Sequence, residues 1–415
     1  MPYYRSVGEL PRKRHQVFHK PDGGLYNEEL MGEEGFSSDA SLLYHANLPT
    51  AIVKSEAVDR PAELDAAVPN RPLLPRGYRT QDLPVGGDVV GGRRLLFVNE
   101  DIRISFVAAD RPSELYRNAV GDEILYVQSG SARFESVYGA MDVGEGDYVV
   151  VPASTTYRFV PLGGGSGSGG VGSDDVVRVM TFESRGHVRP PKRYLSQYGQ
   201  MLEHAPYSER DFRAPTEPLV VDEGETPVLV LHRAGLTRLT YAAHPFDVVG
   251  WDGYLYPYAF NINDFEPIVK RFHAPPPVHQ TFEGPNFVLC SFCPRTLDFD
   301  ETAIRVPYNH ANVDSDEMMF YVGGDYSARK GSGIDIGSIS LHPSGVTHGP
   351  QPGSVEGSIG KPSTDEMAVM VDTFRPLDLG PAARACEDTS YGTSWARNQQ
   401  ARQLGDTESG PGLTA

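Results

Sequence analysis

One pattern occurs twice in this chain of 415 residues, and it restricts the possible folds more than any other feature. Each copy has an Asp-Glu pair, a glycine seven residues after the glutamate, and a later glycine six residues before a proline. These residues are Asp122, Glu123, Gly130, Gly146 and Pro152 in the first copy and Asp316, Glu317, Gly324, Gly337 and Pro343 in the second. We therefore predict two related domains that arose by duplication.

Short apolar runs separated by Gly, Asp and Asn fill the first copy. They are rich in β-branched residues and far too short for helices, so they indicate an all-β fold. The runs lie at 95–98, 102–106, 123–127, 148–151 and 176–179, and a hairpin is predicted over 226–232 and 236–241. The length of the chain allows a large core divided between two barrels.

The repeat divides the chain into five predicted segments. We expect an extended N-terminal arm at 1–90, a first barrel at 91–185, a connecting hairpin and active-site loop at 186–279, a second barrel at 280–395 and a flexible polar tail at 396–415. The stretch at 163–170 consists almost entirely of Gly and Ser, which predicts a flexible loop without chemistry.

The second copy carries residues that suit a metal ion. His310, Glu317 and His348 lie around a strand-like run, and two imidazoles with one carboxylate are the usual protein ligands of a divalent iron that must also bind dioxygen. In the first copy, Tyr116 and Tyr157 occupy the positions of the two histidines. A lone carboxylate is a poor metal site, so we predict that only the second barrel binds metal and that Glu123 is structural.

Charge and cysteine content exclude several functions. A formal net charge of −18 argues against nucleic-acid binding, which depends on Lys and Arg. The three cysteines do not form a disulfide framework, and Cys290-x-x-Cys293 lies among apolar residues typical of a buried strand. The chain lacks a signal peptide and any run of eighteen apolar residues, so we expect a soluble cytoplasmic protein that does not interact with membranes.

Two motifs of the second copy resemble those of the cupin family of jelly-roll barrels. The first is His310-x-Asn312 followed by Glu317, in which Asn312 replaces the usual second histidine; the other is Pro343-x-Gly345-x-x-His348. Together with the segments 26–36, 247–253, 263–266 and 308–350, they make the chain similar to the homogentisate 1,2-dioxygenase family of bicupin enzymes. This resemblance implies Fe(2+) bound by the three predicted ligands, and cleavage of the homogentisate ring with O2 to maleylacetoacetate in tyrosine and phenylalanine catabolism.

The resemblance also implies roles for other residues. His273 matches the active-site base, with His279 as the second candidate, because a neutral imidazole can accept a phenolic proton near neutral pH. Tyr326 and His342 match residues that hold the substrate carboxylate, and His348 and His279 are expected beside the substrate. The family relationship further implies a homo-oligomer, either a trimer or a hexamer, which the N-terminal arm would help to assemble.

Two features depart from the family pattern. One more residue than expected separates His310 from Glu317, and three prolines at 275–277 follow His273 and predict an ordered extended loop. These differences indicate a divergent branch and leave other functions open. The alternatives are a dioxygenase of another hydroquinone or gentisate-type acid, a non-catalytic metal-binding bicupin, and a zinc-dependent bicupin isomerase.

Overall fold

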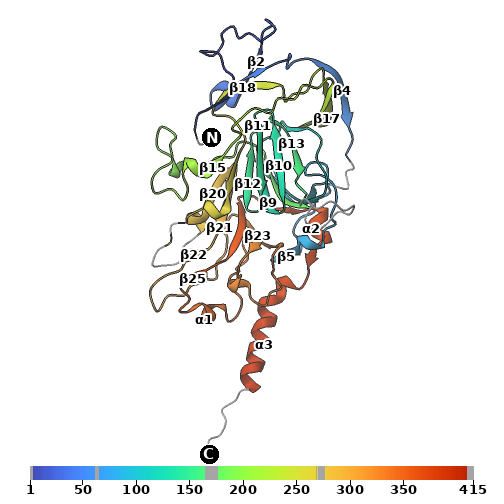
Figure 1. Cartoon of the computed structure of the whole chain (residues 1–415). Coiled ribbons are helices and arrows are strands. Elements are labelled where there is room, and N and C mark those ends of the chain that lie inside the picture. Colours follow the sequence, from blue (N-terminus) through green and yellow to red (C-terminus); the bar gives the residue numbers. More distant parts are fainter. Residues whose placement is uncertain (1–2, 61–64, 164–175, 268, 270–275, 409–415) are drawn as a thin grey trace, which may run out of the picture. The chain divides into compact units, whose positions relative to one another are not determined.

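A computed structural model describes residues 3–60, 65–163, 176–267, 269 and 276–408 (Figure 1). The chain forms two compact units. The first comprises Met1–Ala66, Pro84–Asp264 and Glu283–Pro285, and the second comprises Ala67–Leu83, Phe265–Phe282 and Asn286–Ala415. The predicted all-β fold is confirmed, because strands form the framework of both units.

The barrel of the first unit consists of two facing sheets. One has the order β11-β10-β13-β8-β16-β17-β4, and the other contains β15-β19-β12-β9-β14-β7-β6. The bounds of the first sheet are β11 Gly139–Gly144, β10 Ser131–Ser136, β13 Thr156–Pro161, β8 Tyr116–Asn118, β16 Thr226–His232, β17 Gly235–Tyr241 and β4 Ile52–Val58. Those of the second are β15 Phe212–Arg213, β19 Tyr258–Asn261, β12 Asp147–Val151, β9 Glu123–Ser129, β14 Val177–Ser184, β7 Ile102–Ala109 and β6 Arg94–Val98. Their apolar side chains form a shared core that includes Val107, Leu125, Phe134 and Phe159.

Strand β9 shows why the sequence adopts this fold. It pairs with β12 on one side and β14 on the other, and its residues from Glu123 to Gln128 are buried. A continuous run of apolar and β-branched residues suits a strand that is covered on both faces. The strands predicted from apolar runs correspond to β6, β7, β9, β12 and β14, and the predicted hairpin is β16 and β17.

A single large sheet and several short helices make up the second unit. The sheet has the order β20-β21-β26-β23-β24-β5-β28. Its bounds are β20 Gln280–Gly284, β21 Phe287–Phe292, β26 Met367–Thr373, β23 Asp316–Gly323, β24 Ser338–His342, β5 Arg76–Arg79 and β28 Glu387–Asp388. A two-stranded sheet pairs β22 Arg295–Thr296 with β25 Ser363–Thr364, β27 is Asp378–Leu379, and the helices are α1 Ser354–Ser358, α2 Pro381–Ala385 and α3 Ser394–Glu408.

The same strand pairing occurs in both units, as the internal repeat predicts. Glu123 lies opposite Val151 where β9 pairs with β12, and Glu317 lies opposite His342 where β23 pairs with β24. Val151 and His342 each directly precede the repeated proline. The two glutamates therefore occupy equivalent places in the two units.

The aspartate before each glutamate explains why the Asp-Glu pair is repeated. Asp122 accepts a hydrogen bond from the backbone N–H of Ala153 at 2.8 Å, and Asp316 accepts one from Ser344 at 2.9 Å. Both donors lie just beyond the repeated proline. In each unit a buried carboxylate thus connects the start of one strand to the turn after its neighbour, which satisfies backbone donors that would otherwise be costly to bury.

The N-terminal arm contributes strands to both units. β1 Arg5–Gly8, β2 Asn27–Gly32 and β3 Ala40–His45 form a four-stranded sheet with β18 Val248–Gly253. Strand β4 joins the first barrel, whereas β5 joins the sheet of the second unit. The predicted N-terminal arm at 1–90 is thus divided between the two units, because its last strand belongs to the second.

The flexible tail expected at 396–415 is a helix as far as Glu408, and α3 is red in Figure 1. Ala, Gln, Arg and Leu favour helix in this segment. Hydrogen bonds from Trp395 to the carbonyl oxygen of Gly349 and from Asn398 to Gln351 hold the first two turns. The sequence analysis weighed polarity alone and missed this helix.

Two further expectations can be compared with the described residues. Cys290, Cys293 and Cys386 are buried free thiols, and Cys290 lies in β21 as predicted. Among the helices in the described part of the chain, none has the length and hydrophobicity needed to span a membrane. The Gly/Ser-rich loop falls almost wholly outside the described residues.

Candidate metal centre

Two backbone hydrogen bonds bring the predicted histidine ligands together. His310 and His348 form an isolated antiparallel bridge, with N-to-O distances of 2.8 Å and 2.9 Å. Residues directly opposite each other in such a pair place their side chains on the same face. The two imidazole rings consequently lie with their centroids 4.3 Å apart.

Glu317, the second residue of β23, lies beside both imidazoles. Its carboxylate oxygens are 3.8 Å from Nε2 of His310 and 3.5 Å from Nε2 of His348. Two ligand atoms that each bind one ion at a distance of about 2.1 Å can lie up to about 4 Å from each other. The three predicted ligands are therefore close enough to share one metal ion, and they form one of two such groupings among the described residues.

The protonation of both histidines is set by backbone carbonyl groups. Nδ1 of His310 lies 3.0 Å from the oxygen of Tyr308, and Nδ1 of His348 lies 3.2 Å from the oxygen of Val346. A carbonyl oxygen only accepts hydrogen bonds, so each Nδ1 must carry the proton. Each Nε2 then presents a lone pair toward Glu317, which is how backbone partners usually orient a metal-binding histidine.

One nitrogen of the site has no partner, and a bound cation would provide one. Nε2 of His348 is buried and has no hydrogen-bond partner within the described structure. A buried polar atom without a partner is rare and costly. Because the imidazole and carboxylate donors suit iron, zinc and similar divalent metals, the residues fit the metal that the sequence predicts.

A third histidine orients the carboxylate. Nδ1 of His342 lies 2.7 Å from Oε1 of Glu317, and Nε2 lies 3.0 Å from the hydroxyl of Tyr391. Burial, together with the charge of Arg329, lowers the pKa of His342 to about 3, so the ring is neutral. Nδ1 therefore donates to Glu317, and Nε2 accepts from Tyr391.

The surrounding histidines also keep Glu317 ionised. Burial would raise the pKa of Glu317, but its neighbours His310, His342 and His348 outweigh burial and lower that pKa well below its usual value. An ionised carboxylate is the form that binds a metal. Tyr391 is part of this arrangement and was missed by the sequence analysis, because it lies 74 positions after Glu317 in a segment without a motif.

A second carboxylate lies next to Glu317. Asp372 of β26 is directly opposite Glu317 in the sheet, and its Oδ1 is buried without a hydrogen-bond partner among the described residues. Burial and the charge of Glu317 raise the pKa of Asp372 to about 8. The carboxyl of Asp372 is therefore neutral at neutral pH beside the ionised Glu317, and a cation bound nearby would favour its ionised form.

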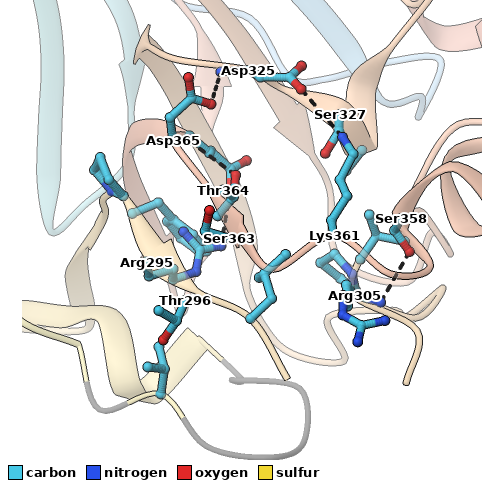
Figure 2. A pocket seen from close by; sticks show the side chains of 18 of the residues that line it. Arg295, Thr296, Arg305, Asp325, Ser327, Ser358, Lys361, Ser363, Thr364 and Asp365 are labelled. Atoms are coloured by element: carbon cyan, nitrogen blue, oxygen red, sulfur yellow. Dashed lines mark hydrogen bonds and ion pairs between the residues drawn. The ribbon is translucent and has the colours of Figure 1, made fainter. Parts of the chain in front are cut away.

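A large cavity reaches the carboxylate of Glu317. Its volume is about 740 Å³, within the range of small-molecule sites, and Phe292, Met319 and Met370 provide apolar wall. Figure 2 shows polar side chains around the cavity, with Arg305 and Lys361 among them. The site therefore combines a place for a metal with space for an organic substrate.

Arg305 contributes a positive charge to this cavity. Its three guanidinium nitrogens donate to the carbonyl oxygens of Asp298, Ala303 and Asp300, at 2.8 to 3.1 Å. Among the described residues its guanidinium has no carboxylate partner, whereas the ammonium of Lys361 lies 3.5 Å from Asp325. No motif in the sequence indicated Arg305.

The remaining predicted residues lie in different surroundings. Tyr326 is buried beside Tyr321, and its hydroxyl has no hydrogen-bond partner in the described structure. His279 is fully buried and stacks on Phe292 with the ring centroids 4.2 Å apart. It ends a short 3-10 helix, Pro276–His279, where the sequence analysis expected an extended loop; the fixed φ of proline suits a 3-10 turn.

His273 and His342 are the other two residues predicted to act on the substrate. His273 lies outside the described residues. His342 has no exposed side-chain surface, and both of its nitrogens are occupied by Glu317 and Tyr391. It contacts the metal ligand, and it is absent from the described lining of the cavity.

Comparisons with known proteins agree with this geometry. The family model described as "Homogentisate 1,2-dioxygenase C-terminal" matches residues 267–402. A Saccharolobus solfataricus protein named "Putative dioxygenase SSO1533" is 38% identical over 95% of this chain and 99% of its own length. The homogentisate 1,2-dioxygenase of Emericella nidulans is 27% identical over 84% of this chain and 71% of its own length.

Among solved structures, a cupin 2 conserved barrel domain protein from Leptotrichia buccalis aligns with 75% of this chain and 100% of its own length. Its TM-score is 0.34 and its sequence identity 9%. The family assignment depends instead on the sequence relatives and on the three ligands that the fold brings together. The chain has an all-β fold and belongs to the homogentisate dioxygenase family.

Proposed function

We propose that this protein is a non-haem iron(II) dioxygenase that opens the aromatic ring of homogentisate with O2 to give maleylacetoacetate. The observation that carries the proposal is the convergence of His310, Glu317 and His348, with both Nε2 lone pairs directed toward one carboxylate. Three protein ligands on one side of an iron ion leave positions for a substrate and for O2.

Bound iron would hold the substrate and O2 together and activate them for ring opening. The chain's own residues would keep that centre in place. His342 holds the carboxylate of Glu317 at 2.7 Å, and two backbone carbonyls keep the imidazole ligands in the metal-binding tautomer. Phe292 and Met319 exclude water from one wall of the cavity and suit a flat ring.

A base must accept a phenolic proton when homogentisate binds. The family resemblance assigns this role to His273, with His279 as the alternative. His279 stacks on Phe292, which lines the cavity, so it lies close behind the wall of the proposed substrate site.

An acidic chain must attract an anionic substrate locally. Arg305 is our candidate for an electrostatic contact with the substrate carboxylate, because its charge is balanced only by backbone carbonyl groups within the described structure. The buried hydroxyl of Tyr326 is a second candidate for this carboxylate, in agreement with the family resemblance.

A related acid is the second candidate substrate. The cavity of about 740 Å³ is large for a single small ring, so gentisate or another hydroquinone acid also fits the site. The two candidates require the same metal centre and differ only in the acid that is cleaved.

Oxygen uptake under defined metal loading tests the proposal. The protein is purified without oxygen, loaded with iron(II), and supplied with homogentisate, gentisate and a neutral hydroquinone. We expect rapid oxygen uptake and an absorbing ring-opened product with homogentisate. A matched H204A variant, which changes a histidine outside the site, should behave like the wild type, whereas H348A should lose both bound iron and activity.

Different outcomes separate the parts of the proposal. Activity with gentisate alone would overturn the substrate and retain the reaction class. Normal turnover by H348A, or iron-loaded protein that consumes no oxygen with any of these acids, would overturn the dioxygenase function. Normal iron content and turnover in H273A would remove His273 as the base.

We also propose a cytoplasmic homo-oligomer, a trimer or a hexamer. The three buried free thiols agree with a reducing compartment. Strand β4 lies at the edge of its sheet and exposes Ile52 and Val53, and such an edge favours pairing with another chain. Light scattering of the purified protein measures the number of subunits.

A further inference from the structure

The first barrel keeps the framework of the metal centre and replaces its two histidine ligands. Tyr116 and Tyr157 pair across adjacent strands, as His310 and His348 do in the second unit. Glu123 occupies the place of Glu317 at the start of the equivalent strand. The three positions that would hold a metal in the second unit are therefore present in the first as two phenols and a carboxylate.

All three positions contact one guanidinium group. The NH1 atom of Arg93 lies 2.5 Å from Oε1 of Glu123, and NH2 donates to the hydroxyl of Tyr157 at 2.9 Å. The same guanidinium carbon lies 5.4 Å from the ring centroid of Tyr116. A fourth contact, 3.1 Å long, joins Arg93 to Glu183.

These contacts hold a permanent positive charge inside the barrel. The side chain of Arg93 is 4% exposed and that of Glu123 is 1% exposed. Burial would lower the pKa of Arg93, but Glu123, Tyr157 and Glu183 raise this pKa by more than burial lowers it, so the guanidinium stays charged. The Nε atom donates to the carbonyl oxygen of Val89 at 2.8 Å, which fixes the direction of the side chain.

The second unit has acids at the two equivalent places, and no arginine forms an ion pair with them in the described structure. Glu183 lies opposite Glu123 in the first unit, and Asp372 lies opposite Glu317 in the second. Within the described structure, Glu317 forms ion pairs only with histidines. In the first unit Arg93 pairs with Glu123 and shares Glu183 with Arg103, whereas in the described part of the second unit no arginine or lysine forms an ion pair with Glu317.

We propose that Arg93 is the resident cation of the first barrel and that its guanidinium takes the place of a metal ion. The position that corresponds to the metal centre is therefore closed to metal in the first barrel of the native protein. Removing the guanidinium opens a site for a small external cation, bound by Glu123, Glu183 and the hydroxyl of Tyr157. An adjoining pocket of about 250 Å³, lined in part by Arg93, Tyr116 and Glu183, provides access.

Metal counting on R93A tests this proposal with Mn²⁺, a cation that prefers oxygen ligands. After stripping with a chelator, R93A should bind one more Mn²⁺ per chain than the wild type, as measured by electron paramagnetic resonance. The double variant R93A/E123Q should lose the extra ion. The matched control is R76A, which removes another well-bonded arginine, paired with Glu387, and should bind no additional Mn²⁺.

Thermal unfolding provides the second readout. Mn²⁺ or millimolar guanidinium should raise the melting temperature of R93A by several degrees and leave R93A/E123Q unchanged. Equal Mn²⁺ binding by R93A and the wild type, or an extra ion that survives E123Q, would overturn the proposal. Because the difference between variants is measured, the result does not depend on whether the second unit is loaded or active.

A pair of milder variants covers the case in which R93A does not fold. R93K keeps a positive charge and should remain folded without an extra Mn²⁺, whereas R93Q keeps hydrogen-bonding groups without the charge. We expect R93Q to melt well below R93K at neutral pH. Equal stability of R93K and R93Q at neutral pH would show that the site does not require a cation.

Discussion

Replacing Tyr391 with phenylalanine tests the hydrogen-bond chain that orients the metal ligand. The Tyr391 hydroxyl is the donor to Nε2 of His342, at 3.0 Å, and the His342 side chain has no exposed surface. The substitution keeps the ring that packs on Trp395 and removes only this hydroxyl. Its effect therefore reports on the contacts of this one hydroxyl, which is two residues away from the metal position.

The expected magnitude follows from burial. Leaving a buried acceptor without its donor costs about 1–3 kcal/mol. Without that donor, His342 can exchange the proton between its nitrogens, and Nδ1 no longer always donates to Glu317. Loss of such an outer partner typically weakens metal binding by about 10- to 100-fold, equivalent to about 1.4–2.7 kcal/mol. The cost of the unpaired acceptor and the expected loss of metal-binding free energy are thus similar in size.

Iron(II) affinity, measured by competition with a chelator, is the deciding assay. The matched control is Y256F, because the hydroxyl of Tyr256 is also buried and donates to the carbonyl oxygen of Tyr3 at 2.6 Å in the first unit. Both variants should lose similar stability, and only Y391F should lose iron affinity. If Y391F binds iron(II) as tightly as Y256F does, the positioning role of Tyr391 is wrong.

Three further predictions concern other parts of the chain. Hydrogen bonds to Asp247 and Glu29 outweigh burial and raise the pKa of His45 to about 9, so its stabilisation is complete below pH 6.5 and lost as the pH rises to about 9. The loss amounts to about 3 kcal/mol of unfolding free energy. In H45Q, the unfolding free energy measured by chemical denaturation should not fall over this pH range. The same fall in H45Q as in the wild type would show that His45 is not its source. R305A should raise KM for an acidic substrate roughly tenfold or more and leave KM for a neutral hydroquinone unchanged. K361A should raise KM less, because the ammonium of Lys361 already pairs with an acid. If R305A changed KM equally for the acidic and the neutral substrate, carboxylate recognition by Arg305 would be excluded. The three cysteines should react with a thiol reagent only after unfolding, because they are buried and burial raises the pKa of the thiols at 293 and 386 to about 11; rapid labelling of the native protein would refute this.

The sequence predicted which candidate metal ligands the fold brings together, because their positions are encoded locally. His310, Glu317 and His348 lie within 39 consecutive residues, and a strand with its neighbouring turn converts their spacing into proximity. The same reasoning matched Tyr116 and Tyr157 to the two histidines, and the structure pairs these tyrosines opposite each other in the first barrel.

Residues that reach the sites from distant segments could not be predicted in this way. Tyr391 and Asp372 approach Glu317 from other elements, and Arg93 approaches Glu123 from 30 positions earlier in the chain. None belongs to a repeated motif. Helix α3 was missed for a related reason, because contacts made by Trp395 stabilise a segment whose polarity alone suggests a tail.

The sequence by itself determined the all-β class, the duplication and the set of side chains that can bind a metal, since these depend on residue type and short-range spacing. Tertiary structure decided which carboxylate faces a side-chain cation and which is left for an external one. The electrostatic environment of a buried acid depends on every charge within a few ångströms, and chain folding brings those charges together from remote positions. Glu123 and Glu317 therefore look alike in sequence, yet Arg93 neutralises the first and histidines surround the second.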